Sequence, residues 1–125
     1  MKLPNCFRLA KKVSSLSDHP QHKLGAVILI NRKPVSVGYN KLYKTHPIMK
    51  KYGSLRTLHA ELSAILQIQN KALLQGATMV VYRSDKQGNP KNARPCSTCE
   101  EILKSFGITK TIYTVENGYR VEEIK

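Results

Sequence analysis

The sequence predicts an α/β protein of three layers, in which helices cover both faces of a mixed β-sheet. Three observations lead to this fold class. Helix-like and strand-like segments follow one another in the order α-β-β-α-β-α-β-β. One strand-like segment is a continuous apolar run, as expected for a central strand that is covered on both faces. The length of 125 residues, of which 41% are hydrophobic, suits a single compact domain over residues 1–125.

The first elements are a helix and two strands. Residues 4–16 carry apolar side chains at helical spacing, so we expect an amphipathic helix there. Residues 23–30 are rich in Val, Ile and Leu, which favours a strand. Residues 31–34 are typical of a turn, after which residues 35–39 return as a second strand. A polar, basic loop follows over residues 40–56.

The middle of the chain predicts a second helix and the central strand. Thr57 is a suitable N-cap, and apolar residues from Leu58 to Leu73 fall on or near one face of the helix that follows. Residues 77–82 form the continuous apolar run and are predicted as the central strand. Residues 83–94 contain Gly, Asn and Pro, which indicates another polar loop.

The last part of the chain predicts a third helix and a β-hairpin. Residues 95–106 are expected to be helical, because Pro suits the first turn of a helix and Gly107 suits its end. Residues 110–115 form a fourth strand. Asn117-Gly118 is a typical tight-turn pair, so residues 119–124 are predicted as a fifth strand antiparallel to the fourth.

Basic residues dominate the charge. Lys and Arg outnumber Asp and Glu by 21 to 8, which gives a formal net charge of +13. Between His19 and Cys99, thirteen Lys and Arg stand against only Glu61 and Asp85. A field of this sign attracts phosphates and accelerates their encounter with the protein. The charge argues for an anionic partner without identifying it, and a basic surface that only aids solubility is the alternative.

The apolar runs and the cysteines bear on the compartment. The longest unbroken apolar run, residues 26–30, is far too short to span a membrane. Residues 1–12 hold no hydrophobic stretch of the signal-peptide type, so we expect a cytoplasmic protein without a membrane partner. The three cysteines are an odd number, and Cys96 and Cys99 stand in a C-x-x-C arrangement, which favours a metal or redox site over a disulfide framework.

Two short motifs carry the candidate chemistry, one at residues 59–61 (His-Ala-Glu) and one at residues 95–99 (Pro-Cys-Ser-Thr-Cys). Each opens a predicted helix. Positions i and i+3 share a helix face, so the sulfurs of Cys96 and Cys99 can reach a common point, and a helix N-terminus favours thiolates. Zinc accepts imidazole and thiolate in a tetrahedral shell. We therefore predict His59, Cys96 and Cys99 as zinc ligands, with one position open for water.

Each motif has another interpretation when it stands alone. His-Ala-Glu can be a capped helix start, and C-x-x-C can be a redox pair. Together and in this order, they match the H-x-E…P-C-x-x-C signature of zinc deaminases. On these residues, the chain resembles the cytidine and deoxycytidylate deaminase superfamily over nearly its whole length.

The resemblance implies an α/β/α fold around a five-stranded mixed sheet with strand order 2-1-3-4-5. It also implies hydrolytic replacement of an exocyclic amine on a nucleobase. Glu61 would take a proton from water, hand it to a ring nitrogen and later protonate the departing amine. Asn40, at the end of the second strand, and the backbone N–H of Ala60 are the implied substrate contacts. An ordinary turn residue is the alternative for Asn40.

Two departures from the family pattern bear on the substrate. Ser63 stands where many deoxycytidylate deaminases have Asn. The hairpin at Asn117-Gly118 resembles the arrangement in free-nucleoside deaminases, whereas a helix usually connects the last strands in tRNA adenosine and polynucleotide cytosine deaminases. The hairpin counts against a polynucleotide substrate, while the positive charge counts for one.

The basic loop supplies candidates for binding a substrate phosphate. Lys44, Thr45 and His46 follow Asn40 closely, and Arg94 immediately precedes the cysteine motif. A solvated loop whose charges touch nothing is the alternative. His19 and His22 are expected to be ordinary surface residues rather than a metal pair.

Three functions remain open at this point. The leading hypothesis is deamination of cytosine to uracil in a small nucleotide such as deoxycytidylate. The second is a base-editing deaminase that acts on single-stranded DNA or RNA, including tRNA. The third is a catalytically silent zinc-binding domain that docks nucleic acid, which the presence of Glu61 argues against. The expected partners are a nucleotide or a single-stranded nucleic acid, and assembly into a homo-oligomer stays open.

Overall fold

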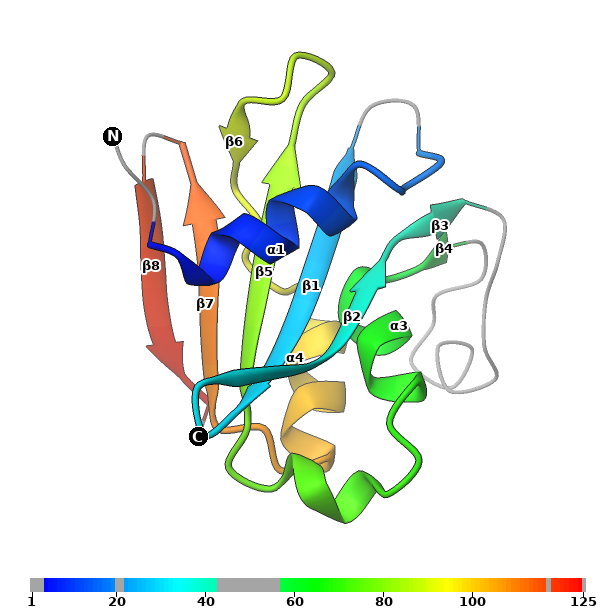
Figure 1. Cartoon of the computed structure of the whole chain (residues 1–125), viewed down its shortest axis with the longest axis vertical. Coiled ribbons are helices and arrows are strands. Elements are labelled where there is room, and N and C mark those ends of the chain that lie inside the picture. Colours follow the sequence, from blue (N-terminus) through cyan, green and yellow to red (C-terminus); the bar gives the residue numbers. More distant parts are fainter. Residues whose placement is uncertain (1–3, 20–21, 43–56, 117, 125) are drawn as a thin grey trace.

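A computed structural model of the protein describes residues 4–19, 22–42, 57–116 and 118–124 (Figure 1). The helices are α1 (Cys6–Ser14), α3 (Ala60–Leu66), α4 (Ser97–Ser105) and the short 3-10 helix η1 (Lys71–Leu74). The strands are β1 (Lys23–Ile30), β2 (Lys33–Tyr39), β3 (Lys41–Leu42), β4 (Thr57–Leu58), β5 (Thr78–Ser84), β6 (Pro90–Lys91), β7 (Lys110–Val115) and β8 (Gly118–Glu123). None of the helices in these ranges has the length and apolar character that crossing a bilayer requires.

The main sheet has the predicted topology. Its strands follow the order β2-β1-β5-β7-β8, which is 2-1-3-4-5 in terms of the predicted strands. β1 is antiparallel to β2 and β5, β5 is parallel to β7, and β8 is antiparallel to β7. The fold class, the strand order and the antiparallel last strand are confirmed. Within the described residues this sheet has six strands rather than five, because the short β6 pairs with β5, and β3 and β4 form a separate small sheet.

Side chains alternate across the sheet and build a core on each face. Val27 of β1 and Val80 and Tyr82 of β5 pack with Phe7 and Ala10 of α1 on one face. Their neighbours in the same strands point to the opposite face and pack against α3 and α4. Figure 1 shows α1 in front of the sheet and the other two helices behind it. The period of two along each strand therefore produces the three predicted layers.

Two glycines allow the helices to approach the sheet closely. A Cβ atom on Gly25 of β1 would lie 2.1 Å from the carbonyl oxygen of Ala10 in α1. A Cβ atom on Gly38 of β2 would lie 2.3 Å from the backbone nitrogen of Ala64 in α3. Both distances are far below van der Waals contact, so only glycine fits at these two positions. The close contact with β2 fixes the position of α3 and of the motif at its start.

The first hairpin is tighter than predicted. Its turn consists of Asn31 and Arg32, both with positive φ (52° and 67°). Lys33 and Pro34 belong to β2 and not to the turn. Two-residue turns with positive φ match the right-handed twist of the flanking strands. Pro34 is tolerated because β2 lies at the edge of the sheet.

The second helix begins later and ends earlier than predicted. Thr57 pairs with Leu42 in the small sheet, so the prediction that it caps the helix is wrong. His59 takes the N-cap position instead. The helix ends at Leu66, and Leu73 lies in η1 with 57% of its surface exposed. Strand pairing with a distant segment therefore outweighs the local capping preference.

Most of the polar loop predicted over residues 83–94 is in fact a β-hairpin, which ends at Lys91. β5 continues to Ser84, and β6 pairs with its end. The carboxylate of Asp85 holds the turn by accepting hydrogen bonds from the N–H groups of Gln87 and Asn89, each at 2.9 Å. The hairpin thereby places Lys91 next to Arg83 at the end of the sheet.

Candidate active site

The first motif lies at the N-terminus of α3. His59 is the N-cap and has an extended backbone (φ −72°, ψ 149°), so Ala60 and Glu61 are the first two helical residues. The close contact between α3 and β2 buries this turn. Ala60 is fully buried, and the Glu61 side chain is buried although it is ionisable, with 4% of the residue exposed.

The second motif lies at the N-terminus of α4. Cys96 is the N-cap, and its sulfur accepts a hydrogen bond from the N–H of Cys99 at 3.4 Å. The helix begins at Ser97, so the predicted start at Pro95 is two residues early. Cys96 is exposed and Cys99 is buried. The capping contact brings both sulfurs to the same end of the helix.

The two motifs meet across the space between the helices. Nδ1 of His59 lies 2.8 Å from Sγ of Cys99. One ligand atom from each of His59, Cys96 and Cys99 lies within 4.8 Å of the others. Within the described ranges, no other set of three His, Cys, Asp or Glu side chains is close enough to hold a metal ion. The structure thus brings together the three predicted ligands.

This donor set fits zinc. Zinc binds imidazole nitrogen at about 2.0 Å and thiolate sulfur at about 2.3 Å, so two donors on one tetrahedral ion are roughly 3.3–3.8 Å apart. The three atoms here differ from that geometry by no more than small side-chain rotations. One imidazole and two thiolates leave a fourth position free, which is typical of catalytic rather than structural zinc sites.

The protonation states of the three predicted zinc ligands and of Glu61 depend on one another. Hydrogen bonds from the Cys99 thiol and from His59 lower the pKa of Cys96 to about 3. The pKa of Cys99 is raised, first by its hydrogen bond to Cys96 and then by burial. The hydrogen bond with Cys96 also raises the pKa of His59. Burial raises the pKa of Glu61, which moves this carboxyl toward the range in which general acid–base catalysis is efficient.

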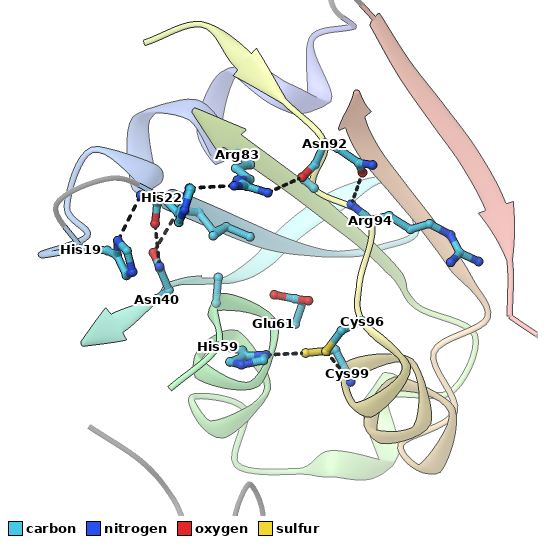
Figure 2. Close-up of a pocket in the computed structure, with 13 residues that line it drawn as sticks. His19, His22, Asn40, His59, Glu61, Arg83, Asn92, Arg94, Cys96 and Cys99 are labelled. Atoms are coloured by element: carbon cyan, nitrogen blue, oxygen red, sulfur yellow. Dashed lines mark hydrogen bonds between the residues drawn. The ribbon is translucent and has the colours of Figure 1, made fainter. Parts of the chain in front are cut away.

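A cavity of about 260 Å³ lies beside these groups (Figure 2). The four groups and Ala60 line one end of it, which we call the zinc end. His19, His22 and Arg83 line the opposite end, which we call the basic end. In Figure 2 the Glu61 carboxylate lies between the two ends and points into the cavity.

Asn40 lines the cavity and holds the chain at the start of β1. Its Oδ1 accepts a hydrogen bond from the N–H of Leu24 at 2.9 Å, and its Nδ2 donates to the carbonyl of His22 at 2.8 Å. The residue is buried, with 4% exposed. The amide therefore has a structural role, and its contact with substrate stays a prediction.

The predicted phosphate ligands are in different situations. Arg94 borders the cavity, but its guanidinium binds Glu122 of β8 with N–O distances of 3.1 and 3.2 Å. In Figure 2 its side chain points away from Glu61. Lys44, Thr45 and His46 lie outside the described residues. Binding of phosphate by these four residues stays a prediction.

The basic end contains residues that sequence reasoning did not place at the site. His19 and His22 are expected from the sequence to be ordinary surface residues, and Arg83 is expected in a loop. His22 and Arg83 are 61 residues apart in the chain, and they meet because β1 and β5 pair in antiparallel fashion. No local spacing could have found them, since the contact exists only after the sheet has formed.

Comparison with known families agrees with the geometry. The family model for the cytidine and deoxycytidylate deaminase zinc-binding region matches residues 2–115, which include both motifs. The chain belongs to this family. It is therefore a zinc-dependent hydrolase that deaminates a nucleobase, and the predicted zinc cofactor is confirmed.

This deaminase is similar to several characterised proteins. It is 27% identical to the deoxycytidylate deaminase of Mycobacterium phage D29, over 87% of this chain and 91% of that protein. The crystal structure of cytidine deaminase from Burkholderia pseudomallei matches with a TM-score of 0.70 at 16% identity, over 99% of this chain and 94% of that one. The dCMP deaminase of cyanophage S-TIM5, in complex with dCMP and dUMP, matches with a TM-score of 0.54 at 17% identity, over 90% and 83%. At these identities the two structures support the fold.

Proposed function

We propose that this deaminase converts cytosine to uracil in a small deoxycytidine nucleotide, with deoxycytidylate as the representative substrate. The observation that carries the proposal is the buried carboxylate of Glu61 in the same cavity as His59, Cys96 and Cys99. The similarity to a phage deoxycytidylate deaminase supports the choice of substrate. The antiparallel β8 supports it as well, because the resemblance associates this arrangement with deaminases of free nucleosides.

The proposed reaction replaces the exocyclic amine of cytosine by oxygen from water. The zinc ion would be held by His59, Cys96 and Cys99. When bound, it would act as a Lewis acid and lower the pKa of water. A carboxylate oxygen of Glu61 accepts the proton that the water gives up and delivers it to the ring nitrogen of the base. The water oxygen bonds to the ring carbon that carries the exocyclic amine. Glu61 then takes the remaining proton of this oxygen and gives it to the amine, so that the C–N bond breaks, a carbonyl forms and ammonia leaves. The raised pKa of Glu61 suits a group that must both accept and return a proton.

Backbone and amide groups are proposed to orient the base. Ala60 is the first residue of α3, so its N–H has no acceptor within the helix and can donate to the base carbonyl. Asn40 uses one acceptor site and one N–H for the backbone near β1, which leaves a second lone pair and a second N–H for substrate. Lys44, Thr45 and His46 are proposed to approach the substrate phosphate from their loop.

A single-stranded nucleic acid is the second candidate substrate. The net charge of +13 favours it, because a polyanion would gain from the whole positive surface. A silent zinc-binding domain is a weaker alternative, because such a domain does not need the carboxylate of Glu61 inside the cavity.

The proposal is tested with a panel of four substrates: deoxycytidine, deoxycytidylate, a cytosine-containing oligonucleotide and tRNA, each assayed for base conversion. We expect the highest kcat/KM for deoxycytidylate and only a weak dependence on salt. Highest activity on the oligonucleotide or tRNA, with a steep loss between low and moderate salt, would instead identify the enzyme as a polynucleotide deaminase.

A further inference from the structure

Strand β8 lies at one edge of the main sheet (Figure 1). Among the described residues it pairs with β7 alone. The N–H of Ile124, directly after β8, donates to the carbonyl of Thr109 at 2.8 Å, in register with the β7–β8 pairing. Because the backbone groups of successive residues point to alternate sides of a strand, those of Tyr119, Val121 and Glu123 are directed away from β7. β8 thus has backbone hydrogen-bonding groups on its outer side.

The two edges of the sheet differ in how they resist pairing with another strand. β2, at the other edge, contains Lys33 and Pro34 and no carboxylate. Lys and Pro are typical of edges that avoid further pairing. β8 contains neither, and its Tyr119 and Val121 side chains are exposed on the α1 side of the sheet, by 40% and 52%. Of the two edges, β8 is the one suited to a further strand.

The charges of β8 are complementary to those of a second, antiparallel β8. In a twofold dimer within one sheet, facing residues lie on the same face, so the axis passes through one residue rather than between two. With the axis at Val121, Arg120 of each copy faces Glu122 of the other. An axis at Arg120 or at Glu122 sets that residue against itself, and like charges that face each other are destabilising. The register centred on Val121 is therefore the favoured one of the three.

The same register uses the backbone groups on the outer side of β8. Val121 faces its own copy and Tyr119 faces Glu123, and these are the three residues whose N–H and C=O groups point away from β7. Each such pair exchanges two hydrogen bonds in an antiparallel ladder. On the α1 side, Tyr119 lies diagonal to Val121 of the partner subunit, within reach of an aromatic ring. Apolar side chains then form one strip across the axis.

The charged side chains that meet in this register are available. Arg120 is exposed and forms no ion pair with a carboxylate of the described residues. The Glu122 carboxylate binds Arg94 and Tyr113 but keeps 38% of its side chain exposed, and a carboxylate has about four acceptor positions. Residues 100–125 contain four Lys and Arg against five Glu, so pairing at β8 brings together segments with almost no net charge, although each chain carries +13.

We propose that two copies of this chain form a dimer through β8, with the strands antiparallel and the twofold axis at Val121. The two sheets then join into one continuous sheet. The contact adjoins the active site, because Glu122 also binds Arg94, which stands two residues before the predicted zinc ligand Cys96. The dimer does not depend on which nucleobase or nucleotide is the substrate.

The first test is sedimentation equilibrium of the zinc-loaded protein in about 0.15 M salt. We expect the native chain to be in monomer–dimer equilibrium, and Arg120→Glu to raise the dimer dissociation constant at least about 10-fold, because it sets carboxylates against each other at two places. Lys104→Glu, on the exposed surface of α4, changes the net charge by the same amount and should leave the dissociation constant unchanged or lower. This control separates the local contact from general repulsion.

A charge exchange tests the register. Glu122→Arg alone should weaken the dimer as well, because it sets cations against each other. An equimolar mixture of the Arg120→Glu and Glu122→Arg chains restores opposite charges at both places, so native mass spectrometry should detect mainly the mixed dimer. Val121→Pro is a second variant in case Glu122→Arg does not fold. It removes an N–H that β7 does not use, so the chain should fold and stay monomeric.

A native protein that stays monomeric up to about 1 mM overturns the proposal. A dimer that both Arg120→Glu and Val121→Pro leave intact overturns it too, since the copies would then meet through another surface. Two folded variants that give no mixed dimer contradict the register centred on Val121.

Discussion

The two ends of the cavity are built in different ways. At the zinc end, two short motifs at helix N-termini supply His59, Cys96 and Cys99, and their ligand atoms lie within 4.8 Å of one another. At the basic end, single residues from distant segments meet through long-range contacts, such as the one between His22 and Arg83. A motif on one helical turn holds its side chains in a set geometry. Residues that meet across a sheet are not marked by any short sequence motif. Three predictions test this difference between the zinc end and the basic end.

The largest expected effect is at the zinc end. Cys99→Ala should abolish zinc binding and reduce deamination more than about 1000-fold, because the remaining two ligands do not hold the ion and water is no longer activated. Metal analysis should find about one zinc per native chain and almost none in the variant. Cys6→Ala is the matched control, since Cys6 lies in α1 on the other face of the sheet. A Cys99→Ala protein that keeps both zinc and activity would remove the assigned site.

The second largest expected effect is at Glu61, whose role in proton transfer can be separated from metal binding. Glu61→Gln should keep zinc and lower kcat roughly 100- to 10,000-fold, because the amide has nearly the same shape but cannot accept the proton. Parallel measurements of kcat and zinc content provide the check. Glu101→Gln, on the exposed surface of α4, should leave both quantities unchanged. Normal turnover in Glu61→Gln would exclude the proposed proton route.

The smallest effect concerns the support of the basic end. Asn40→Ala removes both hydrogen bonds to the backbone near β1 and should lower the free energy of unfolding by about 1–3 kcal/mol, because it leaves the N–H of Leu24 and the carbonyl of His22 unpaired. Zinc content should not change. Urea unfolding measures the effect, and the exposed Asn5→Ala, which removes no capping hydrogen bond, should stay within about 0.5 kcal/mol of the native protein. Loss of zinc in Asn40→Ala would show that the two ends are not independent.

Several structural elements could be predicted because their signals are local. Residues 110–115 were predicted as a strand and are observed as β7 with the same bounds. The Asn-Gly pair correctly predicted a tight connection and an antiparallel β8, because this pair is typical of such connections, although Gly118 itself belongs to β8 and pairs with Val115. The convergence of His59 with the two cysteines followed from two motifs and needed only that the two helices pack on the same face of the sheet.

Other elements could not be predicted because a distant partner decides them. Thr57 has a good capping side chain, yet it pairs with Leu42 in a small sheet, and His59 caps the helix. The polar residues 83–94 have the composition of a loop, but the extension of β5 and its pairing with β6 make most of them a hairpin. In both cases backbone hydrogen bonds to another segment outweigh a weak local preference.

The sequence by itself determined the fold class, the order of the three main helices and the five main strands, the two zinc-site motifs with their carboxylate, and the positive charge. These features depend on periodicity, short spacing and composition, all of which are local. Only the tertiary structure decided that Arg83 and His22 share a cavity with Glu61, and that Arg94 is bound to Glu122. The physical reason is that such contacts depend on strand register and helix packing, which many residues set together and no single segment records.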